Sequence, residues 1–93
     1  MNHWILEGKT PKKVDMTAYL NWLETGTRHI EKTRYGGVLV STVFLGLDHS
    51  FGHGEPLLFE TMIFGGPHDE YQERCSTYEE AEVMHEKACE LVK

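Results

Sequence analysis

The amino-acid sequence predicts one α+β domain, residues 1–93, in which an antiparallel sheet of about four to five strands packs with two helices. Three observations lead to this fold class. Residues 38–47 and 57–64 are apolar runs rich in β-branched and aromatic side chains, as buried strands are. Two other segments, one near each end of the chain, place apolar residues at helical spacing. The chain also lacks repeats and linker-like tracts, which favours a compact single domain.

The N-terminal segment predicts a strand followed by a short amphipathic helix. Residues 2–8, NHWILEG, have the pattern of a strand. Asp15 is a suitable N-cap for a helix over residues 16–25, and Gly26 supplies a stop. The apolar stripe of this helix consists of Met16, Leu20 and Leu23.

The middle of the chain predicts antiparallel strands. Residues 27–35 alternate weakly and meet Gly36-Gly37, a two-residue turn of the primed hairpin type. The two apolar runs follow, and the glycines and proline between them predict a hairpin with a loop of roughly eight residues. Residues 70–75 provide a further edge strand.

The C-terminal segment predicts the second helix. A capping-box pattern occurs twice, as Ser76 with Glu79 and as Thr77 with Glu80. The apolar residues that then recur at helical spacing are Ala81, Met84, Ala88 and Leu91. Acidic residues on the outer face favour solvation; they are Glu79, Glu82, Glu86 and Glu90.

Both faces of the central hairpin are apolar, and this pattern predicts association. One face carries Leu39, Val43, Leu45 and Leu47, and the other carries Val38, Val40 and Phe44. Two helices cover one face of such a sheet. The second face then needs either the N-terminal segment or a symmetric partner, because a large exposed apolar patch is a liability in a monomer. We therefore expect a homo-oligomer.

Charge and composition narrow the classes of partner. The formal net charge is −6, with +1 on residues 1–50 and −7 on residues 51–93. This balance argues against non-specific nucleic-acid binding, which needs clustered cations, but leaves room for a small anionic ligand near the N-terminal cations. No apolar stretch approaches the roughly 20 residues that span a bilayer. The two cysteines form no CxxC motif and no signal peptide is visible, so we expect a reducing, cytoplasmic setting.

Four stretches carry a family resemblance over nearly the whole chain: HWILEGKTP, VSTVFLGLDHSFG, PLLFETMIFGGP and STYEEAEVMH. Together they resemble the successive motifs of a widespread family of small phage and prophage proteins of the same length. The resemblance implies a viral or prophage origin and a place in the host cytoplasm. It implies no mechanism. Asp48, His49, Glu60 and Thr61 match the family motif, whereas His53 and Cys75 depart from it.

Asp48, His49 and Glu60 are the first candidate site residues. Asp48 and His49 leave an apolar run beside a glycine-rich loop, where they either contact a ligand or, for Asp48, close an Asx-turn. Glu60 lies inside the second apolar run and needs the polar side of the sheet or a partner, such as Arg34 or His29. The hairpin register decides its neighbours: one register puts Glu60 on a face with Thr42 and Asp48, and a shift by one puts it with Ser41.

The leading hypothesis is a counter-defence protein that sequesters a nucleotide-derived signal in a subunit-lined pocket, since small phage proteins without enzymatic motifs often act by binding. The expected ligand contacts are Thr42 and Thr61 by hydrogen bonds, Arg34 to phosphate, Trp4 or Tyr35 by stacking, and Asp48, His49 and Glu60 to ribose or base edges.

Two alternatives stay open. The acidic C-terminal helix suits a basic surface of a host defence protein, as a nucleic-acid mimic would. Alternatively, Asp48, His49 and Glu60 perform acid–base or metal-assisted hydrolysis. Recognised nucleophile motifs are missing, and a metal set drawn from His49, His53, Glu60, His68 and Asp69 matches no established zinc spacing. We therefore expect a binding protein without catalytic residues, metal or cofactor.

Overall fold

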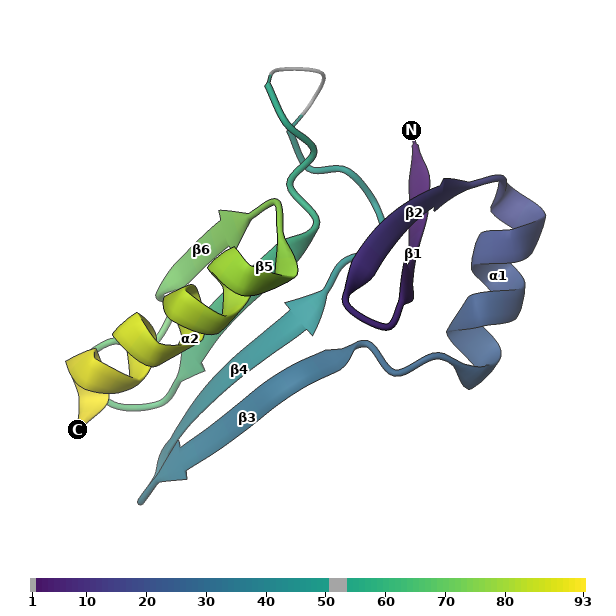
Figure 1. Cartoon of the computed structure of the whole chain (residues 1–93). Coiled ribbons are helices and arrows are strands. Elements are labelled where there is room, and N and C mark those ends of the chain that lie inside the picture. Colours follow the sequence, from purple (N-terminus) through teal and green to yellow (C-terminus); the bar gives the residue numbers. More distant parts are fainter. Residues whose placement is uncertain (1, 51–53) are drawn as a thin grey trace.

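The computed structural model describes residues 2–50 and 54–93 of the chain. Four antiparallel strands form a sheet in the order β3-β4-β5-β6, and helix α2 lies along one face (Figure 1). A two-stranded hairpin, β1–β2, and helix α1 lie beside one end of this sheet (Figure 1). The predicted α+β class is confirmed.

The sheet is built from β3 (His29–Tyr35), β4 (Val38–Phe44), β5 (Phe59–Phe64) and β6 (Gln72–Cys75). The turn between β3 and β4 falls at the predicted Gly-Gly pair. Its first glycine, Gly36, has a φ of +58°, which side chains disfavour.

The two central strands are shorter than the sequence predicts, and the connection between them, residues 45–58, is correspondingly longer. Gly46 explains where β4 stops. Its φ is +78°, and a β-carbon there would lie 2.5 Å from the ring of Tyr19. The ends of the connection stay together, because Leu45 N–H donates to Leu58 C=O at 2.7 Å. The chain therefore leaves the sheet at Gly46 without separating the two strands.

The N-terminal hairpin pairs β1 (His3–Glu7) with β2 (Thr10–Val14). The sequence predicts β1 but not β2. The β2 segment, TPKKV, contains Pro11 and two lysines, which are uncommon in strands. The hairpin joins the rest of the domain through Trp4 N–H, which donates to Gly46 C=O at 2.7 Å.

Helix α1 spans Met16–Thr25, as predicted, and the Asp15 side chain accepts from Ala18 N–H at 2.9 Å. Its predicted apolar stripe is wrong in part, because Met16 and Leu20 are 58% and 53% exposed. The side that packs carries aromatic rings instead. Tyr19 is buried, and Trp22 meets the edge of Phe44 with ring centroids 5.5 Å apart.

Helix α2 spans Tyr78–Val92 and begins with the second of the two predicted capping boxes, Thr77 with Glu80. Ala81, Met84 and Ala88 are buried against the sheet. Leu91, the last residue of the predicted stripe, is 46% exposed because it lies in the final turn of the helix.

The hydrophobic core lies between α2 and the sheet. Phe44, Phe59 and Met84 form its centre, and the N-terminal residues Trp4, Leu6 and Trp22 pack against the same cluster. A second cluster contains Val40, Ile63, Ala88 and Cys89. The N-terminal segment therefore extends the core on the α2 side.

The opposite side of the sheet, which we call the open face, has no helix or strand packed across it within residues 2–50 and 54–93. Beyond the irregularity in β3 between His29 and Glu31, the strand register assigns ten side chains to the open face: Lys32, Arg34, Leu39, Ser41, Val43, Glu60, Met62, Phe64, Gln72 and Arg74.

Candidate functional site

The structure separates the eight predicted ligand residues. Val43 pairs with Glu60 across β4 and β5, so Glu60 shares the open face with Ser41. Thr42 and Thr61 pair with each other and point to the α2 side. Of the predicted ligand set, Arg34 and Glu60 belong to the open face.

Asp48 organises the connection between β4 and β5. Its carboxylate accepts from Ser50 N–H at 2.8 Å and from Leu57 N–H at 3.0 Å. These backbone bonds, first that from Ser50, hold the pKa of Asp48 below its ordinary value. His49 N–H donates to Leu57 C=O at 3.1 Å. The described contacts are those of an Asx-turn, and ligand binding by Asp48 and His49 stays a prediction.

Glu60 is 8% exposed and is held by two neighbours from β6. Arg74 Nε donates to its carboxylate at 3.0 Å, and Gln72 Nε2 donates to the same oxygen. The sequence suggests Arg34 or His29 as the partner, but β4 lies between β3 and β5. The sheet order therefore pairs Glu60 with Arg74 of β6, the neighbouring edge strand, and not with a residue of β3.

A buried chain of hydroxyl groups and one imidazole crosses the core; we call it the His85 network. Thr61 Oγ1 lies 2.5 Å from Thr42 Oγ1, which lies 2.7 Å from His85 Nδ1. His85 Nε2 lies 2.9 Å from Thr33 Oγ1 and 3.7 Å from the carboxylate of Glu31. Thr42 and Thr61 are fully buried, so their hydroxyls contact this network and not solvent.

His85 itself is only 2% exposed. Burial lowers its pKa below the ordinary value, and the Glu31 carboxylate opposes part of that shift. Each ring nitrogen has a hydroxyl partner, which a neutral imidazole satisfies with one donor and one acceptor. The apolar stripe predicted for this helix does not include His85. Its position between Met84 and Ala88 on the buried stripe was the signal that it faces the core.

An acidic hollow of about 400 Å³ lies above this network, between β3 and α2. Tyr35 and Cys89 line it together with carboxylates, namely Glu31, Glu82, Glu86 and Glu90. These charges disfavour a phosphate near Tyr35. Trp4 is elsewhere, packed on the aromatic core, so the two predicted stacking residues do not meet Arg34 at one place.

The open face has the opposite electrostatic character. Lys32, Arg34 and Arg74 bring three cations to it, and Glu60 is the carboxylate among its strand residues. Its apolar side chains, Leu39, Val43, Met62 and Phe64, lie between the two edges of the sheet. An apolar centre with cations at the margins is the surface that best fits the predicted anionic ligand and symmetric partner.

No family model, curated protein or solved structure matches the chain. Neither helix in the described part of the chain has the length and apolar character needed to cross a bilayer. Among residues 2–50 and 54–93, no three His, Cys, Asp or Glu side chains gather closely enough to hold a metal ion. His53, which the metal alternative includes, lies outside the described residues.

The His85 network predicts a pH-dependent stability. Because the pKa of folded His85 is lowered, its contribution is complete above the ordinary histidine pKa of about 6.5 and is lost as pH falls through the folded value. Urea unfolding from pH 7.5 to pH 4.5, roughly the range in which histidine gains its proton, measures this loss. We expect His85→Gln to reduce the slope and the exposed control His29→Gln to keep it. An unchanged slope in His85→Gln contradicts the assignment.

The Glu60–Arg74 pair predicts a strong coupling. Arg74→Met leaves a nearly buried carboxylate without its cation, and we expect a loss of about 2 kcal/mol in unfolding free energy. Glu60→Gln combined with Arg74→Met should lose less than the sum of the single changes. The control Arg34→Met, on the same face but exposed, should stay within about 0.5 kcal/mol. Additive losses in this denaturation cycle contradict the pairing.

Proposed function

We propose that the chain is a phage or prophage counter-defence protein that forms a homodimer through the open face and sequesters a small nucleotide-derived anion at its margin. The observation that carries the proposal is the combination, on one uncovered sheet face, of an apolar centre with cations. The other side of the same sheet is closed by α2 and carries an acidic hollow. Binding is therefore proposed on the open face.

The apolar part of the open face supports a second copy as its partner. Leu39, Val43 and Met62 are half-buried by their neighbours alone, and Phe64 is 45% exposed. Removing such side chains from water stabilises association by about 25 cal/mol for each Å² buried. A sheet face meets its own symmetry mate without any further element, and face-to-face sheets pack about 10 Å apart.

The charges support an anionic ligand. Lys32 and Arg34 are exposed and alternate along edge strand β3, so both point to the same side of the sheet. An arginine beside a lysine suits a phosphate group, through paired N–H donors and a point charge respectively. Glu60 presents a carboxylate on the same face that suits a hydroxyl or amino donor of the ligand. In this proposal Thr42 and Thr61 belong to the His85 network on the α2 side of the sheet and make no ligand contact.

Native mass spectrometry of the protein mixed with a bacterial small-molecule extract tests the proposal. We expect a dimer that carries a nucleotide-sized mass. Met62→Glu places a charge at the centre of the open face and should give a folded monomer, while Leu20→Glu, an exposed change on α1, should remain dimeric. Lys32→Gln with Arg34→Gln should weaken ligand retention about tenfold or more and keep the dimer.

The same experiment gives the contradicting outcomes. A monomer from the unaltered chain removes the dimer, and a dimer that survives Met62→Glu places the interface elsewhere. A dimer without any bound mass, in extracts with and without phage infection, removes the sequestration proposal.

A second candidate is an acidic inhibitor of a host defence protein. It is favoured by the outer face of α2, where four glutamates are exposed on successive turns: Glu79, Glu82, Glu86 and Glu90. Glu31 extends this charge across the acidic hollow to β3. Regularly spaced carboxylates suit a basic, nucleic-acid-binding surface on a host protein.

Charge neutralisation distinguishes this candidate. Changing the four α2 glutamates to glutamine should abolish capture of a basic host protein from a bacterial extract, because long-range attraction is lost. A matched control neutralises four exposed glutamates elsewhere: Glu7, Glu24, Glu55 and Glu70. Capture that survives the α2 changes, or that is lost equally in the control, argues against the α2 surface.

A further inference from the structure

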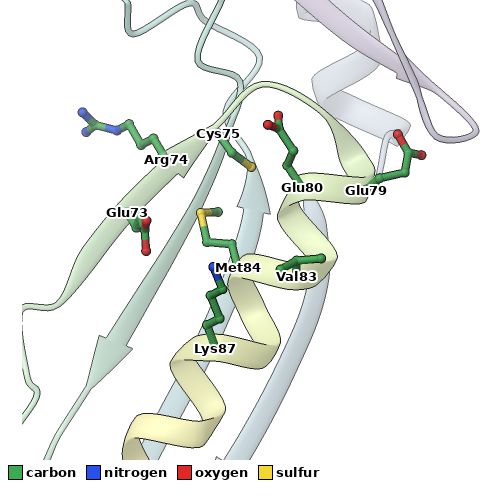
Figure 2. A pocket seen from close by; sticks show the side chains of 8 residues that line it. All are labelled: Glu73, Arg74, Cys75, Glu79, Glu80, Val83, Met84 and Lys87. Carbon is green, nitrogen blue, oxygen red and sulfur yellow. The ribbon is translucent and has the colours of Figure 1, made fainter.

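A groove of about 490 Å³ runs between β6 and α2 (Figure 2). It lies at the opposite edge of the sheet from the acidic hollow, and the two are lined by different residues. Met84 and Cys75 point into the groove in Figure 2, and Val83 lies beside them with 53% of its surface exposed. Burial raises the pKa of Cys75 to about 11, so its thiol is neutral near pH 7 and adds to an apolar floor.

Strand β6 offers an unpaired edge beside this groove. Cys75 C=O accepts from Leu58 N–H at 3.0 Å, and Tyr71 C=O accepts from Ile63 N–H at 3.1 Å, so the odd-numbered residues bond to the β5 side. Backbone groups alternate in direction along a strand, which turns those of Gln72 and Arg74 outward. Within the described chain no strand pairs with that edge. It can therefore accept an added strand.

The charges along the groove follow an order. The first turn of α2 contributes acids, Glu79 and Glu80; the second contributes Val83 and Met84; the third contributes Lys87 (Figure 2). Three other charged residues line the groove but already have partners. The Arg74 guanidinium is paired with Glu60, the Glu73 carboxylate accepts from Tyr71 O–H at 2.6 Å, and Glu80 closes the capping box with Thr77. The remaining charges, both on α2, are thus Glu79 at one end of the groove and Lys87 at the other.

The spacing of these turns matches an extended peptide. Four helical residues rise about 6 Å. Two strand residues rise about 6.7 Å, and alternate strand side chains point to the same side. Helix α2 runs antiparallel to β6 (Figure 2), so a strand added antiparallel to β6 starts at the acidic end and finishes near Lys87.

We propose that this groove binds an extended segment of a partner protein by strand addition to β6, with the pattern basic-x-apolar-x-acidic from its N-terminus. The basic side chain meets Glu79, the apolar one covers Val83 and Met84, and the acidic one meets Lys87. Backbone bonds to Gln72 and Arg74 supply affinity, and the three side chains supply direction.

A second copy of the chain is a poor occupant of the same edge. If β6 pairs antiparallel with itself over its full length, the twofold axis lies near its middle, and either Glu73 or Arg74 faces its own copy. Like charges directly opposite one another destabilise a strand pair. No segment of the chain places a lysine or arginine, an apolar residue and an acidic residue at alternate positions. The similar segment with His3, Ile5 and Glu7 is β1, which is already paired with β2. The occupant is therefore a strand of another protein.

Two synthetic peptides of equal composition test the proposal: Thr-Lys-Thr-Val-Thr-Glu-Thr and its charge-exchanged form, Thr-Glu-Thr-Val-Thr-Lys-Thr. Fluorescence anisotropy measures binding of each to the full chain, and hydrogen exchange reports on the Gln72 and Arg74 amides. We expect the first peptide to bind about tenfold more tightly and to slow exchange at both amides. Glu79→Lys combined with Lys87→Glu should reverse the preference.

Apolar controls separate the groove from the rest of α2. Val83→Glu changes an exposed side chain in the groove and should abolish binding, whereas Leu91→Glu changes an exposed side chain of the same helix outside the groove and should not. Equal binding of the two peptides, no binding of either at millimolar concentration, or slowed exchange on β3 instead of β6 would overturn the proposal.

Discussion

The pairing of Val43 with Glu60 determines what each side of the sheet can do. It places Val40, Phe44, Phe59 and Ile63 on one side with α2, and it leaves Glu60 and Met62 on the other. A shift by one residue would bury Glu60 under the helix, where no cation of β6 could reach it, and would move the aromatic core into water. The other features follow from this register. The His85 network lies on the α2 side of the sheet, the Glu60–Arg74 pair lies on the open face, and the groove and the acidic hollow lie along the two edges.

Local signals in the sequence were sufficient where the structure depends on neighbouring residues. Asp15 begins α1 and Thr77 begins α2, because a cap needs only a side chain and the amides that follow it. Long-range features were not accessible in this way. The partner of Glu60 depends on the order of four strands, and the burial of His85 depends on which helix face meets the sheet. The sequence does not predict β2, because this largely exposed strand contains a proline and two lysines and so lacks the apolar alternation of a buried strand.

The sequence predicts which residues are candidates for the site, but it does not predict which of them lie together in the structure. Asp48, Thr42 and Thr61 each have polar partners of their own, and these partners come from the connection or the core. Arg34 and Glu60 occupy the face that remains. The reason is geometric: adjacent residues on a strand point to opposite faces, so motif residues that are neighbours in sequence, such as Glu60 and Thr61, are divided by the sheet. Charge is divided in the same way: the cations Lys32, Arg34 and Arg74 lie on the open face, and the carboxylates of the acidic hollow lie beside α2.

Gly46 also bears on how this chain can change during evolution. Its positive φ angle disfavours residues with a side chain, and the ring of Tyr19 occupies the space that a β-carbon would need. A smaller residue at position 19 would remove the second obstacle and leave the first, so no single substitution frees position 46. The contact also ties a residue of α1 to the point where β4 ends. Sequence drift in the N-terminal helix is therefore limited by a glycine far along the chain, although much of the helix surface is exposed.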